Sequence, residues 1–261
     1  MPMQATFEPV AWLKGPSCHC ENLPPLTCRP WRLVLLGPPG VGKGTQATLW
    51  GQKYNCCQLS TGDLFRAAKQ QKPEERTPAM NEAIAYMSRG ELVPDATVLE
   101  VVRERAHCLK CERGFQLDGF PRTVPQAAAL KELLREQGVE LDGVVSLEMD
   151  LETNIARLAG RRTCSSCKAI YQLQTRPPKV EGICDKCGGK LFQREDDRPE
   201  AIRVRMATYD KETSPLIEYY RKEGLLVPVF SHYHVEDTLA ESIVKLEAHA
   251  QARAKRTATP A

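Results

Sequence analysis

The chain has 261 residues, of which 42% are hydrophobic and 26% are charged. That usage is ordinary for a soluble protein, and no apolar run approaches the roughly 18 residues that a membrane span needs. The 36 basic and 33 acidic residues are too closely balanced for a general nucleic-acid surface. We therefore expect one globular core and no membrane or nucleic-acid partner. Anionic ligands are expected to bind only where basic residues cluster locally.

The first segment, residues 1–30, has prolines at positions 16, 24, 25 and 30 and no clean hydrophobic period. We predict an irregular extension that packs through Trp12 and Trp31. Only Lys14 and Arg29 are basic there, which does not fit the arginine-rich pattern of a mitochondrial presequence, and no secretory signal is present. We expect a cytoplasmic protein, with an organelle as the alternative location.

The fold proper begins with WRLVLLG at 31–37, a continuous apolar run typical of a strand buried in a parallel sheet. It enters a glycine-rich stretch, GPPGVGKGT at 37–45, which a helical stretch follows. Glycines let successive N–H groups point into one concavity, Lys43 adds a positive charge, and the helix presents its positive end. These effects predict a phosphate-binding loop whose contacts are Gly40, Val41, Gly42, Lys43, Gly44 and Thr45.

Further apolar runs alternate with helical stretches along the rest of the chain. Buried strands are predicted at 114–120, 143–149 and 226–230, and helices at 94–107, 124–137, 151–160 and 198–222. This alternation predicts a parallel sheet with helices on both faces. The tail at 248–261 is expected to fray after the last helix.

Two insertions interrupt the alternation. One is helical and covers residues 61–89. The other, at 162–196, contains cysteines and glycines and has β character at 169–173 and 190–194. Both are predicted to project from one α/β core.

Three further strings accompany the loop: STGDLFR at 60–66, LDGFPRTVPQA at 117–127 and REDDRPEAIRVR at 194–205. Together with GPPGVGKGT they resemble the adenylate kinases, a nucleoside monophosphate kinase family, over about residues 31–240. The general phosphate-loop pattern has a hydroxyl directly after the lysine, but here Gly44 intervenes, as it does in that family. The resemblance implies reversible Mg-dependent transfer, ATP + AMP = 2 ADP, which maintains adenine nucleotide balance.

The resemblance also implies an architecture: a P-loop kinase core with a parallel five-stranded sheet flanked by helices, a helical NMP-binding insert and a small β-rich zinc lid. The predicted divisions are an extension at 1–30, a kinase domain at 31–245 and a C-terminal tail at 246–261. Within the kinase domain they are core segments 31–60, 92–160 and 197–245, the insert 61–91 and the lid 161–196. We expect the chain to act as a monomer.

Arginines carry much of the expected chemistry, because phosphoryl transfer is catalysed mainly by alignment and electrostatic stabilisation. The resemblance places Arg66 and Arg122 on the acceptor phosphate and Arg157 on the donor base. A solvated surface charge is the alternative for any single arginine. The predicted catalytic residues are Lys43, Asp118, Arg122, Arg161, Arg194 and Arg205.

Two acidic residues are candidates for contact with the hydrated Mg²⁺ that accompanies ATP, with Asp118 favoured over Asp63. A structural role is an equal alternative, in which Asp63 caps a helix or Asp118 orients Arg122. Asp196 and Asp197 are instead expected to latch the lid.

The acceptor is predicted from residues that follow Arg122. Relatives that act on UMP and CMP commonly carry Asn there, whereas Thr123 with Gln126 resembles the AMP type. An amide side chain such as that of Gln126 offers adenine both a donor and an acceptor. The predicted AMP-binding residues are Thr61, Arg66, Glu91, Leu92, Val93, Gly119, Phe120, Pro121, Arg122, Gln126, Arg194 and Arg205. Beyond the loop, the predicted ATP-binding residues are Arg157, Arg161, Ile170, Tyr171 and Leu239.

Eleven cysteines include two neighbouring CxxC pairs, CSSC at 164–167 and CDKC at 184–187. This spacing predicts a zinc site. Four thiolates leave no open position, so the ion is expected to be structural, and the resemblance points to long-lid adenylate kinases. Two disulfides or unmetallated thiols are the alternatives. The predicted ligands are Cys164, Cys167, Cys184 and Cys187.

A third CxxC pair, Cys108 and Cys111, has no second pair near it in sequence, and helix-end packing is the favoured explanation. Three other functions remain open for the chain: a GTP:AMP phosphotransferase, a zinc-ribbon nucleic-acid-binding ATPase, and a binding protein that has lost catalysis. The ATPase is disfavoured because the cysteine block has only Tyr171 and Phe192 for base stacking.

Overall fold

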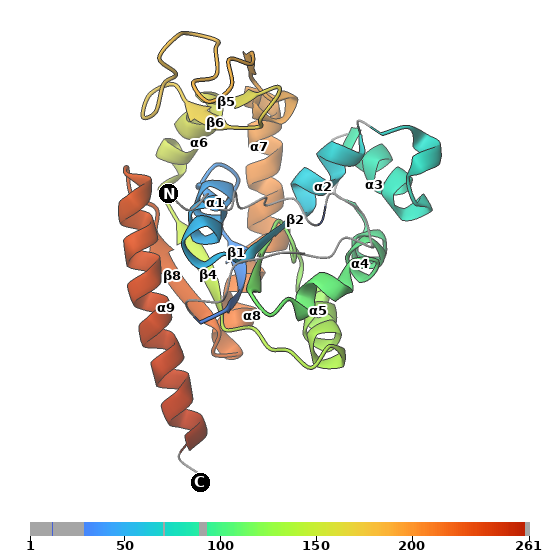
Figure 1. The fold of residues 1–261 in the computed structure, drawn as a ribbon, viewed down its shortest axis with the longest axis vertical. Helices are drawn as coiled ribbons and strands as arrows, with labels where there is room; N and C mark the ends of the chain where they lie inside the picture. Colours follow the sequence, from blue (N-terminus) through green and yellow to red (C-terminus); the bar gives the residue numbers. More distant parts are fainter. Residues whose placement is uncertain (1–11, 13–28, 70, 89–92, 259–261) are drawn as a thin grey trace, which may run out of the picture.

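The computed structural model describes residue 12 and residues 29–69, 71–88 and 93–258. At its centre is a five-stranded parallel sheet in the order β2-β3-β1-β4-β8 (Figure 1). The strands are β1 (Trp31–Leu36), β2 (Cys57–Ser60), β3 (Gly114–Asp118), β4 (Gly143–Glu148) and β8 (Leu226–Phe230). The predicted sheet is therefore confirmed, and β2 is the strand that the apolar pattern did not locate.

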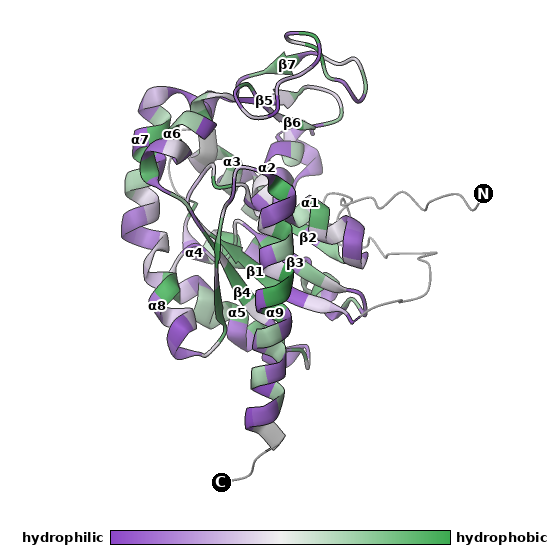
Figure 2. Cartoon of the chain, turned by 90° about the vertical axis from the view of Figure 1, so that its left-hand side faces the viewer, coloured by the Kyte–Doolittle hydropathy of each residue, from purple (hydrophilic) through white to green (hydrophobic). Residues whose placement is uncertain are grey.

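Side chains of β1 alternate between two cores, because successive residues of a strand point to opposite faces. Leu33 and Leu35 join a core that includes side chains of α1 (Lys43–Tyr54) and α9 (Val235–Ala258). Val34 and Leu36 join a larger core on the other face, to which the helices α4 (Asp95–Arg103), α5 (Val124–Glu136) and α8 (Pro215–Lys222) contribute. The strands of the central sheet are accordingly coloured largely as hydrophobic (Figure 2).

Both insertions project from this core (Figure 1). The first is helical and comprises α2 (Thr61–Ala68), the 3₁₀ turn η2 (Pro73–Glu75) and α3 (Pro78–Ser88). The second is an antiparallel sheet of β5 (Arg161–Cys164), β6 (Ile170–Gln172) and β7 (Leu191–Phe192). It lies between α6 (Leu151–Ala159) and α7 (Pro199–Thr208), with a 3₁₀ turn, η4 (Glu195–Asp197), before α7.

The single helix predicted at 198–222 is divided. After α7 the chain makes a π-helical turn, η5 (Tyr209–Thr213), and α8 then starts at Pro215. Proline has no N–H to donate to the preceding turn, so it suits the start of a helix and interrupts its interior. The helix predicted at 94–107 likewise ends at Arg103, before the 3₁₀ segment η3 (Ala106–Lys110).

The expectation that the tail frays is wrong, because α9 continues to Ala258. Leu246 is fully buried in the core under this helix, and Arg253 donates a hydrogen bond of 2.8 Å to the Leu141 carbonyl. Tertiary contacts therefore extend the helix well past residue 245. None of the described helices, α9 included, has both the length and the apolarity that a bilayer crossing requires.

The packing predicted for two tryptophans is confirmed. Trp12 is 1% exposed and Trp31 is 3% exposed, and they belong to the cores on opposite faces of the sheet. Arg105 also donates from Nε to the Trp12 carbonyl over 3.3 Å. Residue 12 is thus attached to the α/β core, while the rest of residues 1–28 lies outside the described residues.

Candidate active site

The predicted phosphate loop joins the carboxyl end of β1 to the start of α1. Gly37, Gly40 and Gly42 have φ angles of 136°, 90° and 105°, a region that other residues rarely adopt. A Cβ on Gly40 would lie 2.6 Å from the Asn154 side-chain oxygen, and one on Gly37 would lie 2.6 Å from the Leu147 carbonyl. The loop backbone is thus packed so closely on its surroundings that these positions require glycine.

Lys43 is the first residue of α1 and folds back over this loop. Its ammonium donates to the carbonyls of Gly37 at 2.6 Å and Pro38 at 2.9 Å. Burial lowers the pKa of Lys43 to about 8, an effect that Asp118 opposes and that Arg122, Arg205 and Arg161 reinforce. The lysine therefore sits in a field that is already positive and that a phosphate would neutralise.

Asp118 ends β3 at the edge of the sheet where the loop lies, with Leu35 and Ser60 as its neighbours across the ladder. One of its carboxylate oxygens is 3.6 Å from the position that a Cβ on Gly44 would occupy. Burial raises the pKa of Asp118, while the charge of Lys43 opposes the rise. The structure thus brings Asp118, the phosphate loop and Lys43 together as predicted.

Arginines of the lid and of α7 share one buried carboxylate, Asp197. Arg161 donates to it from Nε at 2.7 Å and from a terminal nitrogen at 2.5 Å, and Arg205 contacts it at 3.1 Å. Arg205 also pairs with Asp196 at 3.1 Å. Because Asp197 is fully buried, it fixes the first residue of the lid against α7.

Arg194, at the far end of the lid, donates from Nε to the Thr163 hydroxyl at 3.0 Å. Burial and then the neighbouring charges of Arg161 and Arg66 lower the pKa of Arg194 to about 10. Arg66 comes from α2 in the other insertion. Cations from both insertions thus approach one another, which disfavours this arrangement unless anions come between them.

The residues predicted to bind the acceptor lie on α2 and on the turn after β3. A Cβ on Gly119 would lie 2.9 Å from the Thr61 hydroxyl, so Thr61 and Gly119 are adjacent. Arg122 donates from Nε to the Gly119 carbonyl at 2.8 Å. In the same turn Phe120 and Pro121 are buried and joined by a cis peptide bond.

The capping role considered for Asp63 is wrong. Ser60 is the N-cap of α2 and accepts a hydrogen bond from the Asp63 N–H at 3.2 Å. Asp63 itself pairs with Arg66 at 2.6 Å. Burial alone would raise the pKa of Asp63, but Arg66 holds it below its usual value. Asp63 is thus an ion-pair partner of Arg66, which is predicted to bind the acceptor phosphate.

Gln126 is held in a network that includes a residue the sequence analysis missed, Asp95. The amide nitrogen of Gln126 donates to Asp95 at 2.7 Å, and its oxygen accepts from the Arg122 N–H at 2.8 Å. The Thr123 hydroxyl donates to the other oxygen of Asp95 at 2.9 Å. In the sequence, Asp95 is only an acidic residue in the first turn of α4, a position that the helix dipole favours for a negative charge.

Near Arg157, which is predicted to bind the donor base, lies another residue that sequence reasoning missed, Ser231. Its hydroxyl donates to the Val41 carbonyl of the phosphate loop at 2.8 Å and accepts from Arg157 at 3.2 Å. Arg157 also donates to the His232 carbonyl at 2.9 Å. The segment after β8 therefore links the loop to Arg157. A single serine after a strand carries no sequence signal for such a contact.

The remaining residues predicted to bind ATP or AMP have contacts with parts of the chain other than the phosphate loop. The Leu239 carbonyl accepts from the Ser242 hydroxyl at 2.8 Å. Ile170 and Tyr171 lie on β6, and the Tyr171 hydroxyl contacts the Cys184 sulfur at 3.4 Å within the lid. Val93 is buried, whereas Glu91 and Leu92 lie outside the described residues.

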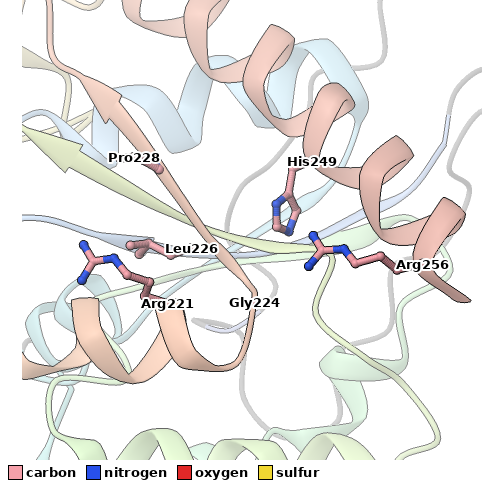
Figure 3. A pocket seen from close by; sticks show the side chains of 6 residues that line it. All are labelled: Arg221, Gly224, Leu226, Pro228, His249 and Arg256. Carbon is pink, nitrogen blue, oxygen red and sulfur yellow. The ribbon is translucent and has the colours of Figure 1, made fainter. Parts of the chain in front are cut away.

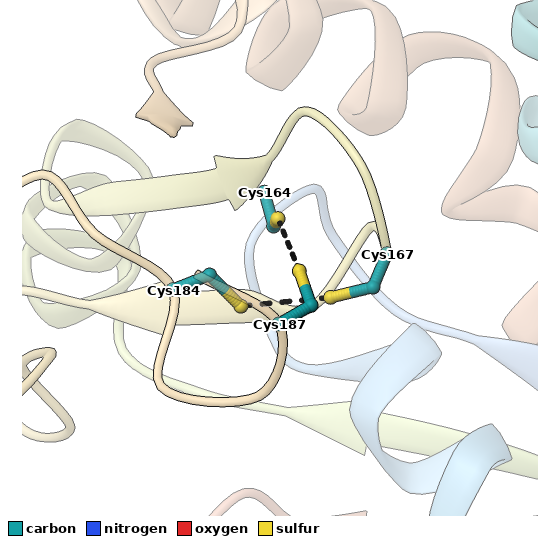
Figure 4. Close-up of side chains that lie close together, drawn as sticks. All are labelled: Cys164, Cys167, Cys184 and Cys187. Carbon is teal, nitrogen blue, oxygen red and sulfur yellow. Dashed lines mark hydrogen bonds between the residues drawn. The ribbon is translucent and has the colours of Figure 1, made fainter. Parts of the chain in front are cut away.

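The four lid cysteines are brought together as predicted (Figure 4). Their sulfur atoms all lie within 4.8 Å of one another. Cys164 is 3.5 Å from Cys187, and Cys167 is 3.5 Å from Cys184, far longer than the roughly 2.0 Å of a disulfide bond. The arrangement has the donor number and the spacing that suit a tetrahedral zinc ion.

A surface pocket lies elsewhere, where β8, α8 and α9 meet. Arg221, Gly224, Leu226, Pro228, His249 and Arg256 line it (Figure 3). It is at the amino-terminal end of β8, whereas the phosphate loop follows the carboxyl end of β1. In a parallel sheet these two places lie at opposite ends of the strands, so the pocket takes no part in the site described above.

This fold and site define a class of protein, the P-loop phosphotransferases that act on nucleotides: a loop lysine lies within electrostatic range of a strand-end aspartate and of arginines from separate segments. A family model described as adenylate kinase matches residues 35–225. An adenylate kinase of Thermodesulfovibrio yellowstonii is 52% identical over 198 residues, 76% of this chain and 90% of the relative.

Two further relatives have similar identity and coverage. An adenylate kinase of Carboxydothermus hydrogenoformans is 47% identical over 209 residues, 80% of this chain and 96% of the relative. One of Archaeoglobus fulgidus is 46% identical over 215 residues, 82% of this chain and 97% of the relative. The chain belongs to the adenylate kinase family and is a nucleoside monophosphate kinase.

Proposed function

We propose that this chain catalyses reversible phosphoryl transfer between ATP and AMP to give two molecules of ADP. The observation that carries the proposal is that Asp118, Arg122, Arg161 and Arg205 all lie near enough to Lys43 of the phosphate loop for their charges to act on it. This cationic group suits the several negative charges that two nucleotides bring together. The family membership supports the same reaction.

The residues have distinct roles in the proposed reaction. An oxygen of the AMP phosphate attacks the γ-phosphorus of ATP, a new P–O bond forms, and the bond from that phosphorus to the β-phosphate oxygen breaks, so that ADP leaves. Lys43 and the loop N–H groups hold the donor phosphates, and Arg66 and Arg122 hold the acceptor phosphate. Arg161, Arg194 and Arg205 stabilise the charge that spreads over the transferring group.

Mg²⁺ bound with ATP would neutralise phosphate charge and hold the oxygens in a fixed geometry. Asp118 is the carboxylate that we propose to contact its hydration shell, because it lies beside Gly44 and at the carboxyl edge of the sheet. Asp118→Asn removes the negative charge while keeping the shape. We expect it to lower turnover and to raise the Mg²⁺ concentration needed for half-maximal activity.

AMP is proposed as the acceptor because Thr123 and Gln126 resemble the AMP type and the structure fixes both through Asp95. ATP is proposed as the donor. Residues for both nucleotides come from one chain, and we propose that a monomer suffices for activity, which sedimentation of the active enzyme would test.

We propose that the lid cysteines hold one structural zinc ion. The support is the compact group of four sulfurs, which fills a tetrahedral shell and leaves no position for substrate or water. The lid has a small core of its own, in which Cys164, Tyr171 and Cys184 are the buried members, so an ion would stiffen it. The paired variant Cys167→Ser and Cys187→Ser should lose one zinc and increase proteolysis within residues 161–196.

The deciding experiment measures ADP formation with ATP or GTP as donor and AMP, GMP, UMP or CMP as acceptor. We expect turnover with ATP and AMP to exceed that with every other pair. Faster conversion of another monophosphate would overturn the acceptor assignment, and preference for GTP would show a GTP:AMP phosphotransferase instead. An unchanged rate in Lys43→Met would refute the site itself.

A further inference from the structure

One buried side chain of the lid contacts the cysteine cluster without belonging to it. Tyr171, on β6, is 5% exposed, and its hydroxyl lies 3.4 Å from the Cys184 sulfur. The buried members of the small lid core are Tyr171 and two of the proposed zinc ligands, Cys164 and Cys184. None of the reaction steps proposed above uses the Tyr171 hydroxyl.

The hydrogen bonds of Tyr171 decide where its own proton goes. The Asp185 N–H donates to the Tyr171 oxygen at 2.8 Å, so the hydroxyl proton is free to be donated elsewhere. A cysteine bound to zinc is a thiolate and has no proton to donate. When the ion is bound, the contact with Cys184 is therefore a hydrogen bond from the Tyr171 hydroxyl to the sulfur.

Tyr171 thereby holds the first two residues of the second knuckle. Its single oxygen bonds to the sulfur of Cys184 and to the N–H of Asp185. The backbone of the knuckle has bonds of its own: the Cys184 N–H donates to the Gly189 carbonyl, and the Gly188 N–H donates to the Cys184 carbonyl, both at 2.8 Å. The backbone bonds fix the turn, and the tyrosine fixes the direction of the sulfur.

The same tyrosine connects the cysteine cluster to the strand that carries an arginine of the predicted active site. β6 pairs with β5 in a register that sets Tyr171 opposite Arg162, the neighbour of Arg161. Arg161 in turn donates to the buried Asp197 at 2.7 Å. A continuous series of contacts thus runs from Cys184 through Tyr171 and the β5–β6 ladder to Arg161.

We propose that Tyr171 is a positioning residue of the lid zinc site, whose hydroxyl orients the Cys184 sulfur, stabilises its thiolate and so raises the affinity for the ion. Groups that hydrogen-bond to metal ligands orient those ligands, and their removal typically costs 10- to 100-fold in metal affinity. The inference rests on the proposed lid zinc and extends that site to a residue that is not a ligand.

The test uses a pair of matched variants. Tyr171→Phe removes the hydroxyl and keeps the ring in the lid core. The control is Tyr220→Phe on α8, because Tyr220 is 2% exposed and its hydroxyl has no hydrogen-bond partner among the described residues. Each variant loses one buried hydroxyl, but only Tyr171→Phe loses a bond to a proposed zinc ligand.

The first measurement is the zinc affinity of the full chain, determined by competition with a chelator of known affinity. We expect the Kd of Tyr171→Phe for zinc to be at least about tenfold higher than that of the parent, and the Kd of Tyr220→Phe to equal it. Equal affinity of the parent and Tyr171→Phe would overturn the positioning role while leaving the zinc site intact. A parent chain that binds no zinc would instead overturn the zinc site, and this role with it.

A second measurement separates a bond to the sulfur from a general effect on lid packing. Cobalt(II) is placed in the lid site, and the sulfur-to-cobalt charge-transfer absorption of the three chains is compared. A hydrogen bond stabilises the negative charge of a thiolate, so its loss should move this absorption to longer wavelength in Tyr171→Phe alone. An identical absorption in all three chains would show that the hydroxyl does not act on the sulfur, and the proposal would be wrong.

Discussion

Lys43 shows how one side chain depends on its neighbours for its protonation state. Burial and three arginines lower its pKa to about 8, against the opposing charge of Asp118. Its ammonium is meanwhile held by two loop carbonyls. Triphosphate binding would add negative charge beside it and raise that pKa, because an opposite charge favours the protonated form. Binding of the donor should therefore be coupled to proton uptake.

The first prediction is that ATP binding takes up a proton on Lys43 at pH 8 to 9. Below pH 8 the lysine is already charged and uptake should be small, whereas above it the neutral form must be protonated and the affinity should fall as the pH rises. Isothermal titration calorimetry in buffers of different ionisation enthalpy measures this uptake.

Two variants serve as controls for this measurement. Lys43→Arg keeps its charge throughout the range and should bind without the extra uptake. Lys43→Met should also lose it, with a large loss of turnover and little change in the free energy of unfolding. Equal proton uptake in the parent and in Lys43→Arg would show that another group titrates.

Asp95 is the second case at this scale, because it fixes two residues predicted to select the acceptor. We expect Asp95→Ala to raise the KM for AMP about tenfold, which corresponds to about 1.4 kcal/mol, because Gln126 and Thr123 lose a shared acceptor. The KM for ATP should change little. Steady-state kinetics with each nucleotide varied in turn measures both.

Glu218→Ala is a suitable control for Asp95, since Glu218 is an exposed partner of Arg221 on α8. It should leave both KM values unchanged. An equal rise in the two KM values of Asp95→Ala would indicate a general loss of structure, and the positioning role would then be wrong.

At the scale of elements, the sequence pattern located strands better than the ends of helices. WRLVLLG and LVPVF are apolar runs bounded by turn signals, and both form strands. The four residues of β2 were missed because CQLS is short and contains two polar side chains, yet all four are buried. Its pairing with β3 is a long-range contact that local periodicity does not report.

The course of α9 is the clearest departure from expectation at this scale. The tail is rich in charged residues and alanine, which favour a helix only weakly without packing. Leu246 and the bond from Arg253 to Leu141 provide that packing. The end of this helix is therefore decided by the core that lies beneath it.

The third prediction concerns this packing. Leu246→Ala should lower the free energy of unfolding by about 2 to 5 kcal/mol, because it leaves a cavity in a fully buried position. Val244→Ala, on the same helix at 66% exposure, should have little effect. Urea unfolding of both variants measures the difference, and similar midpoints for the two would mean that α9 is not held as the structure shows.

At the scale of the whole molecule, the fold assembles one site from segments that are far apart in sequence. The phosphate loop, the turn after β3, the first insertion and the lid all contribute cations. The sheet brings the first two together because the carboxyl ends of parallel strands share one edge. Asp197 then connects the lid to α7, so that lid position and arginine geometry are coupled.

The N-terminal extension contributes to the folded core through Trp12, whose side chain is buried there. We predict that Trp12→Ala lowers the free energy of unfolding by about 3 to 5 kcal/mol, as expected for a buried tryptophan. Tyr233→Ala, at 61% exposure, is the matched control for loss of an aromatic ring. Thermal and urea unfolding test this, and an unchanged stability of the Trp12 variant would show that residue 12 is dispensable to the core.

The sequence by itself determined the phosphate loop, the parallel α/β class, the family and the four lid cysteines. These follow from local features, namely glycine spacing, apolar runs and CxxC pairs. Such features can be interpreted without knowing which distant residues they contact. Only the tertiary structure revealed the hydrogen bond between Asp95 and Gln126 and the one between Ser231 and the phosphate loop. Asp95 and Ser231 are ordinary residues in their own stretches of chain, and each acquires a role because the strand register and the packing of helices bring it to a distant partner.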